Sequence, residues 1–250
     1  MLRTENLTKV FRTEEVETTA LNGVNIEVKD GEFVAIMGPS GCGKSTLLSI
    51  LGLLDNPTGG NYFLDGEEVG HLREKDRTRF RKGRIGFVFQ SFNLIEELTV
   101  EENIDLQLRY LGIGRKERRE RVLEILRKVN LSQRAGHYPQ QLSGGQQQRV
   151  AIARAVVGKP RLILADEPTG NLDGKTGQEI MRMLDGLRSQ GTGIVVVTHN
   201  LAHVREVPGR VYECKDHTMT ERADLSAAAA TITDSLPEGG GGSKVVQVVE

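Results

Sequence analysis

Four short apolar runs recur along the chain and predict buried strands. They occupy residues 32–37, 84–89, 162–165 and 194–197, and none of them alternates regularly between apolar and polar side chains. A strand without this alternation is buried on both faces, which is typical of a parallel sheet covered by helices on both sides. The pattern therefore predicts an α/β fold.

The segments outside these runs follow two other patterns. The first 30 residues mix apolar, threonine and charged positions around the turn signals Asn22-Gly23 and Asp30-Gly31, which predicts short antiparallel strands. From about residue 91 to residue 158 the pattern is helical, and segment 115–129 places its apolar residues on one face. A further amphipathic helix is expected around Ile180 and Leu187, between the last two apolar runs.

These patterns predict one domain over residues 1–222, with a helical subdomain at about residues 91–158 inserted into it. The tail 223–250 has a different composition. An alanine run and the glycine-rich segment 239–243 favour a flexible tail. The last segment, 244–250, is apolar enough to add a strand to a sheet edge as an alternative.

Composition narrows the range of partners. The 33 basic and 34 acidic residues nearly cancel, and tryptophan is absent, so nothing favours a nucleic-acid partner. The two cysteines lie far apart, which excludes a disulfide framework or a zinc-knuckle spacing and fits a reducing compartment. No run approaches the ~18 apolar residues of a spanning helix, and no secretory signal is visible at the start. A membrane role would therefore require another chain.

A glycine-rich loop follows the first apolar run and predicts a nucleotide site. Its sequence, GPSGCGKS at residues 38–45, matches the phosphate-loop pattern G-x-x-x-x-G-K-[ST], and a strand precedes it while a helix at residues 45–54 follows. Backbone N–H groups of such a loop converge on phosphates, the lysine reaches the β- and γ-phosphates, and the serine hydroxyl binds Mg²⁺. We expect nucleotide contacts from Gly38, Pro39, Ser40, Gly41, Cys42, Gly43, Lys44, Ser45 and Thr46.

Two carboxylates complete the expected catalytic site. Asp166 and Glu167 come directly after the apolar run 162–165. Asp166 is suited to hold Mg²⁺, and Glu167 is suited to polarise an attacking water as a general base. The alternative for two adjacent acids after a strand is the N-cap of a helix.

Four further motifs give the chain a resemblance to the ATP-binding cassette (ABC) ATPases. The sequence LSGGQ at residues 142–146 is similar to the family's signature motif, Gln90 to its Q-loop glutamine, segment 170–173 to its D-loop, and His199 to its switch histidine. The resemblance covers roughly residues 2–215.

The resemblance implies the fold, the cofactors and the assembly. It implies a phosphate-loop core with an N-terminal antiparallel β subdomain and an inserted α-helical subdomain. It also implies ATP and Mg²⁺ as ligands, with Gln90 joining Ser45 and Asp166 at the metal and acting in catalysis together with Lys44, Glu167 and His199. Two chains would sandwich two ATP molecules, so that the phosphate loop of one faces the signature residues of the other, which are Ser143, Gly144, Gly145 and Gln146. The free N–H groups at the start of a helix over 143–157 suit this contact with a γ-phosphate.

Several positions have two interpretations. Phe11 lies where the family carries an aromatic residue that stacks on adenine, or it is a core residue of the N-terminal strands. Cys42 is a reactive thiol whose alkylation blocks nucleotide binding, or a small filler. The apolar positions after Gln90 form a groove for a helix of the membrane subunit, or the core of the helical subdomain; these positions are Phe92, Leu94, Ile95 and Leu98.

Two charged features favour simpler interpretations. The basic stretch 73–84 is expected to be a solvated face. His199 and His203 have the spacing of helical metal ligands, but Asn200 stands where a zinc-protease motif has glutamate, so a γ-phosphate contact by His199 is favoured.

The resemblance is strongest to the lipoprotein-releasing and macrolide-efflux branch, on segments 52–60 and 142–153. It implies a chain in the cytoplasm that is held at the inner face of the cell membrane by a separate transmembrane permease, which it energises for export, lipoprotein release or transmission of force across the envelope. A cell-division-type or regulatory ATPase that signals by dimerising, without pumping, is the alternative. A cassette acting on DNA or ribosomes is disfavoured, because no long coiled coil or second cassette is present.

Overall fold

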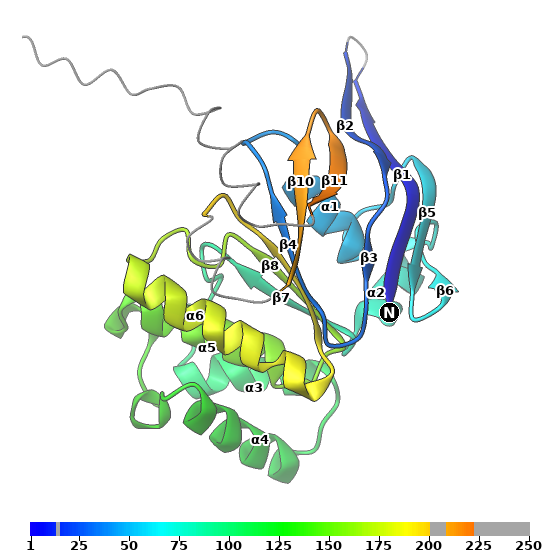
Figure 1. Cartoon of the computed structure of the whole chain (residues 1–250). Coiled ribbons are helices and arrows are strands. Elements are labelled where there is room, and N and C mark those ends of the chain that lie inside the picture. The colour runs from blue at the N-terminus through cyan, green and yellow to red at the C-terminus, as the bar shows by residue number, and fades with distance from the viewer. Residues whose placement is uncertain (14–15, 201–208, 223–250) are drawn as a thin grey trace, which may run out of the picture.

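A parallel sheet forms the centre of the structure. The computed structural model describes residues 1–13, 16–200 and 209–222. Among these residues, six strands run in the order β11 (Thr218–Arg222), β10 (Arg210–Lys215), β4 (Phe33–Met37), β9 (Gly193–Val197), β8 (Leu162–Asp166) and β7 (Ile85–Phe89). All neighbours are parallel except β11, an edge strand antiparallel to β10. The expected parallel sheet is therefore confirmed (Figure 1).

Helices cover both faces of this sheet because its strands carry apolar side chains on both sides. Val34 and Ile36 of β4 join a core that contains α1 (Lys44–Leu51), whereas Ala35 between them joins a second core that contains α6 (Gly174–Gly186). Figure 1 shows α1 and α6 on opposite sides of the sheet. Because both faces of the strand are buried, its sequence does not alternate between apolar and polar residues.

A second sheet is antiparallel and begins at the N-terminus, as expected. The long strand β1 (Leu2–Arg12) pairs with β2 (Glu17–Val24), β3 (Glu27–Val28) and β5 (Gly59–Leu64), and β6 (Glu67–Glu68) pairs with β5. The pattern of the sequence did not reveal β5 or β6, which follow the phosphate loop. β5 depends on β1 for its hydrogen bonds, and β1 lies some 60 residues earlier in the chain, while β6 depends on β5.

Tyr62 of β5 joins the antiparallel sheet to the helix that follows the phosphate loop. Its side chain is completely buried, and its hydroxyl donates a hydrogen bond to the backbone oxygen of Leu51 at 2.7 Å. Leu51 is the last residue of α1, so the hydroxyl satisfies a carbonyl that the helix leaves without a partner. This contact fixes the far end of α1 against the antiparallel sheet.

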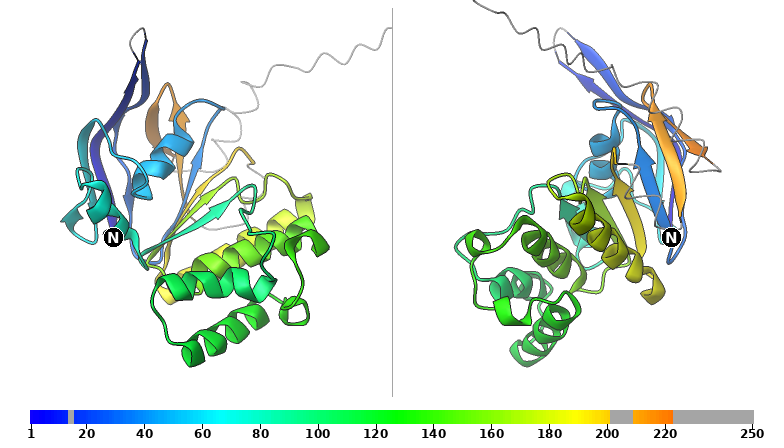
Figure 2. Two further views of the ribbon diagram at one scale, coloured as in Figure 1. Left: turned by 180° about the vertical axis from the view of Figure 1, so that it is seen from behind. Right: turned by 60° about the vertical axis from the view of Figure 1, so that its left-hand side comes forward.

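The helical subdomain has a core of its own. It contains α3 (Val100–Tyr110), α4 (Arg115–Lys128), the single turns η1 (Ser132–Arg134) and η2 (Pro139–Gln141), and α5 (Gly144–Val156). The apolar faces of α3, α4 and α5 pack on one another in this core. The opposite side of α5 contributes Ile152 and Ala155 to the second core of the parallel sheet, so α5 connects the two parts. Figure 2 shows α3 and α4 lying beyond α5, away from the sheet.

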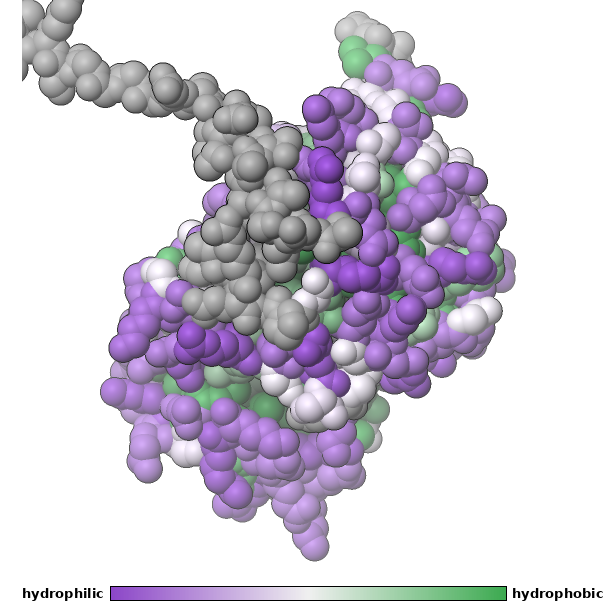
Figure 3. Space-filling view, in the orientation of Figure 1, coloured by the Kyte–Doolittle hydropathy of each residue, from purple (hydrophilic) through white to green (hydrophobic). Residues whose placement is uncertain are grey.

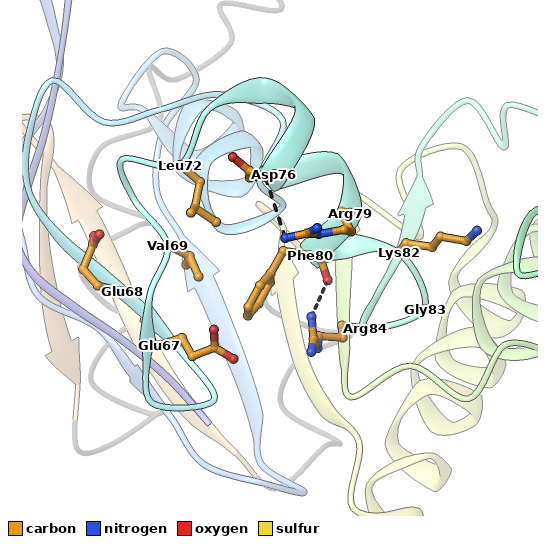
Figure 4. Close-up of a pocket in the computed structure, with 10 residues that line it drawn as sticks. All are labelled: Glu67, Glu68, Val69, Leu72, Asp76, Arg79, Phe80, Lys82, Gly83 and Arg84. Carbon is orange, nitrogen blue, oxygen red and sulfur yellow. Dashed lines mark hydrogen bonds and ion pairs between the residues drawn. The ribbon is translucent and has the colours of Figure 1, made fainter.

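The basic stretch 73–84 contains a helix that its charge pattern did not predict, α2 (Glu74–Arg81), in which no residue is buried. Acidic residues occupy its first turn and arginines its last, which suits the helix dipole. A hollow of about 660 Å³ lies between α2 and the segment around β6, and Phe80 is among its lining residues (Figure 4). A further turn, η3 (Arg188–Gln190), follows α6.

The surface is mainly hydrophilic on the face that Figure 3 shows. No helix among the described residues has the length and apolar character needed to cross a membrane. The predicted flexible tail 223–250, its alternative strand 244–250 and His203 lie outside the described residues, and the domain boundaries stay a prediction.

Candidate functional site

The glycine-rich loop lies between β4 and α1, at the carboxyl edge of the parallel sheet. Helix α1 begins at Lys44 and ends at Leu51, and is therefore shorter than expected; Gly52 is its C-cap. Its N-cap, Gly43, has a φ of 106° and offers no side-chain cap, so the first N–H groups of the helix stay available to an anion. A Cβ atom on Gly43 would lie 2.2 Å from the backbone oxygen of Ala20, which excludes any larger residue there.

The ammonium group of Lys44 lies within the curl of this loop. Its Nζ donates hydrogen bonds to the backbone oxygens of Gly38 at 2.9 Å and Pro39 at 2.7 Å, and lies 3.8 Å from the Sγ of Cys42. The side chain is buried, which strengthens its attraction to an anion because little water screens the charge. A charge held in this way is suited to bind the phosphates of a nucleotide.

Ser45 and Asp166 come together from α1 and the end of β8. Burial and the adjacent Glu167 raise the pKa of Asp166, although the nearby Ser45 hydroxyl and the charge of Lys44 oppose this rise. A divalent cation between Ser45 and Asp166 would relieve the cost of a buried carboxylate. The oxygen donors also suit Mg²⁺, which commonly takes one or two protein ligands and completes its shell with phosphates and water.

Glu167 and His199 form a contact that the sequence does not place. The Oε1 of Glu167 lies 2.8 Å from the Nδ1 of His199, which follows the neighbouring strand β9. Glu167 has a φ of 46°, a left-handed conformation that is strained for a residue with a side chain. Its N–H donates to the backbone oxygen of Val197 at 2.9 Å, which holds the residue in this conformation. Two adjacent strand ends thus direct a carboxylate and an imidazole at each other.

The alternative interpretation of these acids as a helix N-cap is wrong. The next helix, α6, begins at Gly174, and its N-cap is Asp173, which accepts a hydrogen bond from the N–H of Thr176 at 3.0 Å. Asp166 and Glu167 lie before the turn that leads to this helix. They are therefore free of a capping role.

Gln90 pairs with Asn171, a residue of the motif at 170–173, although the sequence did not predict this contact. Its Nε2 donates to the Oδ1 of Asn171 at 3.2 Å, and the Nδ2 of Asn171 donates to the backbone oxygen of Gln90 at 3.2 Å. Asn171 belongs to segment 170–173. This reciprocal amide pair joins the segment after β7 to the segment before α6.

The signature segment begins helix α5. Ser143 is the N-cap, and its Oγ accepts from the N–H of Gln146 at 3.4 Å, while the N–H of Ser143 donates to the Oε1 of Gln146 at 3.0 Å. Ser143, Gly144 and Gly145 line a hollow of about 470 Å³, which no residue of loop 38–46 lines. The signature residues therefore border a different recess from that of the phosphate loop of the same chain.

Gly145 has a second function that the sequence does not show. A Cβ atom there would lie 2.5 Å from the Cγ2 of Thr176 on α6. A side chain at position 145 would therefore displace the Thr176 side chain where α5 approaches α6. At Gly144 the nearest atom is 3.6 Å away, an ordinary contact, so the packing within the chain is closer at Gly145 than at Gly144.

Gln148 is a positioning residue that sequence analysis missed. Its side chain is completely buried, and its Nε2 donates to the backbone oxygen of Pro168 at 2.7 Å. Pro168 directly follows Glu167, so this bond connects the signature helix to the segment that carries the carboxylate. The signal for it was a polar residue on the buried face of α5, one turn before Ile152.

Phe11 is exposed to 46%, so its interpretation as a core residue is wrong. The Nζ of Lys9 lies 5.0 Å from the centre of its ring, and an ion pair to Asp55 at 2.7 Å holds Lys9 in place. Ile95 is exposed as well, and the other apolar positions after Gln90 are partly exposed, although Leu94 packs against the helical core. The segment that contains Phe92, Leu94, Ile95 and Leu98 therefore belongs to the core of the helical subdomain only in part.

Comparison with known proteins agrees with this geometry. The family model described as ABC transporter matches residues 21–170. An uncharacterized ABC transporter ATP-binding protein of Thermotoga maritima is 54% identical over 198 residues, which are 79% of this chain and 85% of that protein. The macrolide export ATP-binding/permease protein MacB of Brucella melitensis is 42% identical over the whole of this chain, which spans 39% of that protein.

A solved structure adds evidence on the fold. The dimeric ATP-binding cassette MJ0796 of Methanocaldococcus jannaschii, bound to ADP and Pi in a post-hydrolysis state, superposes with a TM-score of 0.81 at 46% identity. The superposition covers 89% of this chain and 98% of that chain. The phosphate loop, the paired acids and the family match all agree: the chain belongs to the ABC transporter family and is one of its ATP-binding, ATP-hydrolysing cassettes.

Proposed function

We propose that Glu167 is the general base of ATP hydrolysis and that His199 orients it. The contact of 2.8 Å between the Glu167 carboxylate and the His199 ring carries this assignment. The carboxylate is mostly buried beside Asp166, whereas the His199 side chain is 71% exposed and therefore accessible to a γ-phosphate. The base deprotonates or orients the attacking water, and Lys44 and the loop N–H groups stabilise the charge that develops on the phosphates.

Mg²⁺ is proposed as the metal, held by Ser45, Asp166 and Gln90. When bound, it neutralises charge on the β- and γ-phosphates. The remaining residues of 38–46 line the phosphates, and all of them except Pro39, which has no N–H group, bind through backbone N–H groups; Phe11 stacks on the adenine.

The active form is proposed to be an ATP-dependent homodimer in which Ser143–Gln146 of one chain approach the γ-phosphate bound by the other. The N-cap geometry of Ser143 supports this, since a helix start attracts an anion. The dimeric state of the solved cassette at 46% identity supports it as well.

The proposed partner is a transmembrane permease at the inner face of the membrane, and the proposed role is export, lipoprotein release or transmission of force across the envelope. The similarity to a macrolide export ATP-binding/permease protein supports this role. A cell-division-type or regulatory ATPase is the second candidate. Purification of the membrane complex decides between them: vectorial transport in vesicles that contain the chain and its permease supports the first, and ATP-dependent dimerisation without transport supports the second.

Replacing Glu167 with glutamine tests the catalytic assignment. We expect Glu167→Gln to lower the ATPase rate by roughly 10²–10⁴-fold, the usual contribution of a general base, while the variant still forms a dimer with ATP. Glu124→Gln is the matched control, because Glu124 lies on α4 and pairs with the surface residue Lys128. Steady-state ATPase assays and light scattering on a sizing column measure both properties. Normal hydrolysis by Glu167→Gln would remove this residue from catalysis.

A further inference from the structure

The two cysteines of the chain meet at the phosphate loop although 172 positions separate them. Strand β10 runs parallel to β4 with Glu213 opposite Met37, so Cys214 lies beside the first residue of the loop, Gly38. The Sγ of Cys214 donates a hydrogen bond to the backbone oxygen of Cys42 at 2.8 Å. Neither cysteine takes part in a disulfide in this structure.

Their side chains share the space beside Gly38. A Cβ atom on Gly38 would lie 2.9 Å from the Cβ of Cys214 and 3.0 Å from the Sγ of Cys42. The Cys42 side chain, from the phosphate loop, and the Cys214 side chain, from β10, therefore approach the same point. Two cysteines can be bridged only when their side chains point toward each other in this way.

The two thiols have different acidities. The neighbouring Cys214 thiol contributes most to lowering the pKa of Cys42 to about 6; burial opposes the shift, and the charge of Lys44 adds to it. The Cys42 sulfur and burial raise the pKa of Cys214. These opposite shifts favour the thiolate, which is the nucleophilic form, at Cys42 rather than at Cys214.

We propose that Cys42 and Cys214 form a reversible disulfide on exposure to hydrogen peroxide, and that this bond lowers the affinity of the phosphate loop for ATP. The Cys42 sulfur attacks a peroxide oxygen and the O–O bond breaks. Cys42 becomes a sulfenic acid, and the departing hydroxide takes up a proton to give water. The Cys214 sulfur then attacks the Cys42 sulfur, the S–O bond breaks, and the Cys214 proton leaves with the hydroxide as a second water. Two sulfurs are oxidised and one peroxide is reduced.

Burial limits the oxidants that reach this pair. Cys42 is 6% exposed and Cys214 is completely buried, so a molecule as small as peroxide is the reagent that fits. A bond between them ties the middle of the phosphate loop to β10. The loop N–H groups then cannot move to surround the phosphates. This effect on ATP rests on the proposed nucleotide site, whereas the disulfide itself does not.

The test uses the full 250-residue chain, which contains two cysteines. The reduced protein is treated with hydrogen peroxide and then unfolded, its free thiols are blocked with N-ethylmaleimide, and the digest is searched by mass spectrometry for the linked Cys42 and Cys214 peptides. ATP affinity is measured before oxidation, after it and after dithiothreitol. We expect the linked peptide within one chain, a loss of affinity of roughly tenfold or more, and full recovery with dithiothreitol. Mg-ATP present during oxidation should slow the linkage, since phosphates compete for Lys44.

Cys214→Ala is the informative variant because Cys214 lies outside the nucleotide-binding residues. It should bind ATP as the wild type does, but peroxide should oxidise its Cys42 to a sulfinic acid that dithiothreitol does not reverse. Recovery of Cys214→Ala with dithiothreitol, or oxidation of wild-type Cys42 without the linked peptide, would overturn the proposal. A linked peptide with unchanged ATP affinity would overturn the proposed effect of the disulfide on ATP binding. If Cys214→Ala does not fold, the wild-type peptide analysis still decides. If the reduced chain fails to bind ATP, the nucleotide site is refuted, and the disulfide is judged on the peptides alone.

Discussion

Ser143 has two proposed tasks, as the cap of α5 and as a ligand of the γ-phosphate in the partner chain, and substitutions separate them. Ser143→Ala removes the Oγ that accepts from Gln146 at 3.4 Å but keeps the reverse bond from the Ser143 N–H. Loss of an N-cap costs about 0.5–2 kcal/mol, and the length of this bond places the cost in the lower half of that range. The chain should therefore fold, with a modest loss of stability.

A matched control exists because a second helix has the same capping box. Thr99 caps α3, with its Oγ1 accepting from Glu102 at 3.3 Å and donating to the Glu102 carboxylate at 2.9 Å. Thr99→Ala should lower the free energy of unfolding by about 1 kcal/mol, a loss of the same order. It should leave ATP-dependent dimerisation unchanged, because Thr99 lies in the helical subdomain, away from the signature recess.

Ser143→Ala and Thr99→Ala are expected to differ in ATP-dependent dimerisation. A hydrogen bond to a charged group contributes about 1.5–3 kcal/mol, so Ser143→Ala should weaken the ATP-dependent dimer by roughly 10–100-fold for each of its two sites. Ser143→Asp should retain the cap, since aspartate is a good N-cap residue, yet abolish the dimer by charge repulsion with the phosphate. Urea denaturation measures stability, and ultracentrifugation in the Glu167→Gln background with ATP measures dimerisation. Equal dimerisation by Ser143→Ala and Thr99→Ala would refute the contact in trans.

Two further predictions concern the rim of the site and the pH dependence of stability. Phe11→Ala should weaken ATP binding by about 1–3 kcal/mol through loss of a stacking surface, while Phe11→Tyr should bind normally; titration with a fluorescent ATP analogue checks this, and wild-type affinity of Phe11→Ala would contradict stacking. Burial acts to raise the pKa of Glu32, but hydrogen bonds from Arg210 and from the Lys29 N–H lower it below the ordinary 4.5. The ionised carboxylate therefore stabilises the fold above that pH, and the stabilisation is lost as the pH falls through the lowered pKa. Glu32→Gln should unfold at lower urea concentration at pH 7, with the difference from wild type shrinking in acid; a difference that does not change with pH would exclude this charge as its source.

The sequence determined the type of most elements and the local motifs of the site. The four apolar runs predict β4, β7, β8 and β9 because burial on both faces leaves a direct record in the residue types. The phosphate loop is equally local, since its shape depends on glycines within a few positions of Gly43. The capping residue Ser143 and its partner Gln146 likewise lie three positions apart in the chain.

Only the tertiary structure decided which residues meet across the chain. Strands β5 and β6 are weakly apolar; β5 forms because β1 supplies hydrogen bonds from far away in the sequence, and β6 then pairs with β5. The contacts Glu167 to His199, Gln90 to Asn171, and Cys214 to Cys42 depend on the order of strands in the sheet. Residue patterns reveal that a strand is buried, but every apolar strand is chemically suited to several neighbours. Packing of the whole domain decides which strands become neighbours. It therefore also decides which catalytic side chains lie close together.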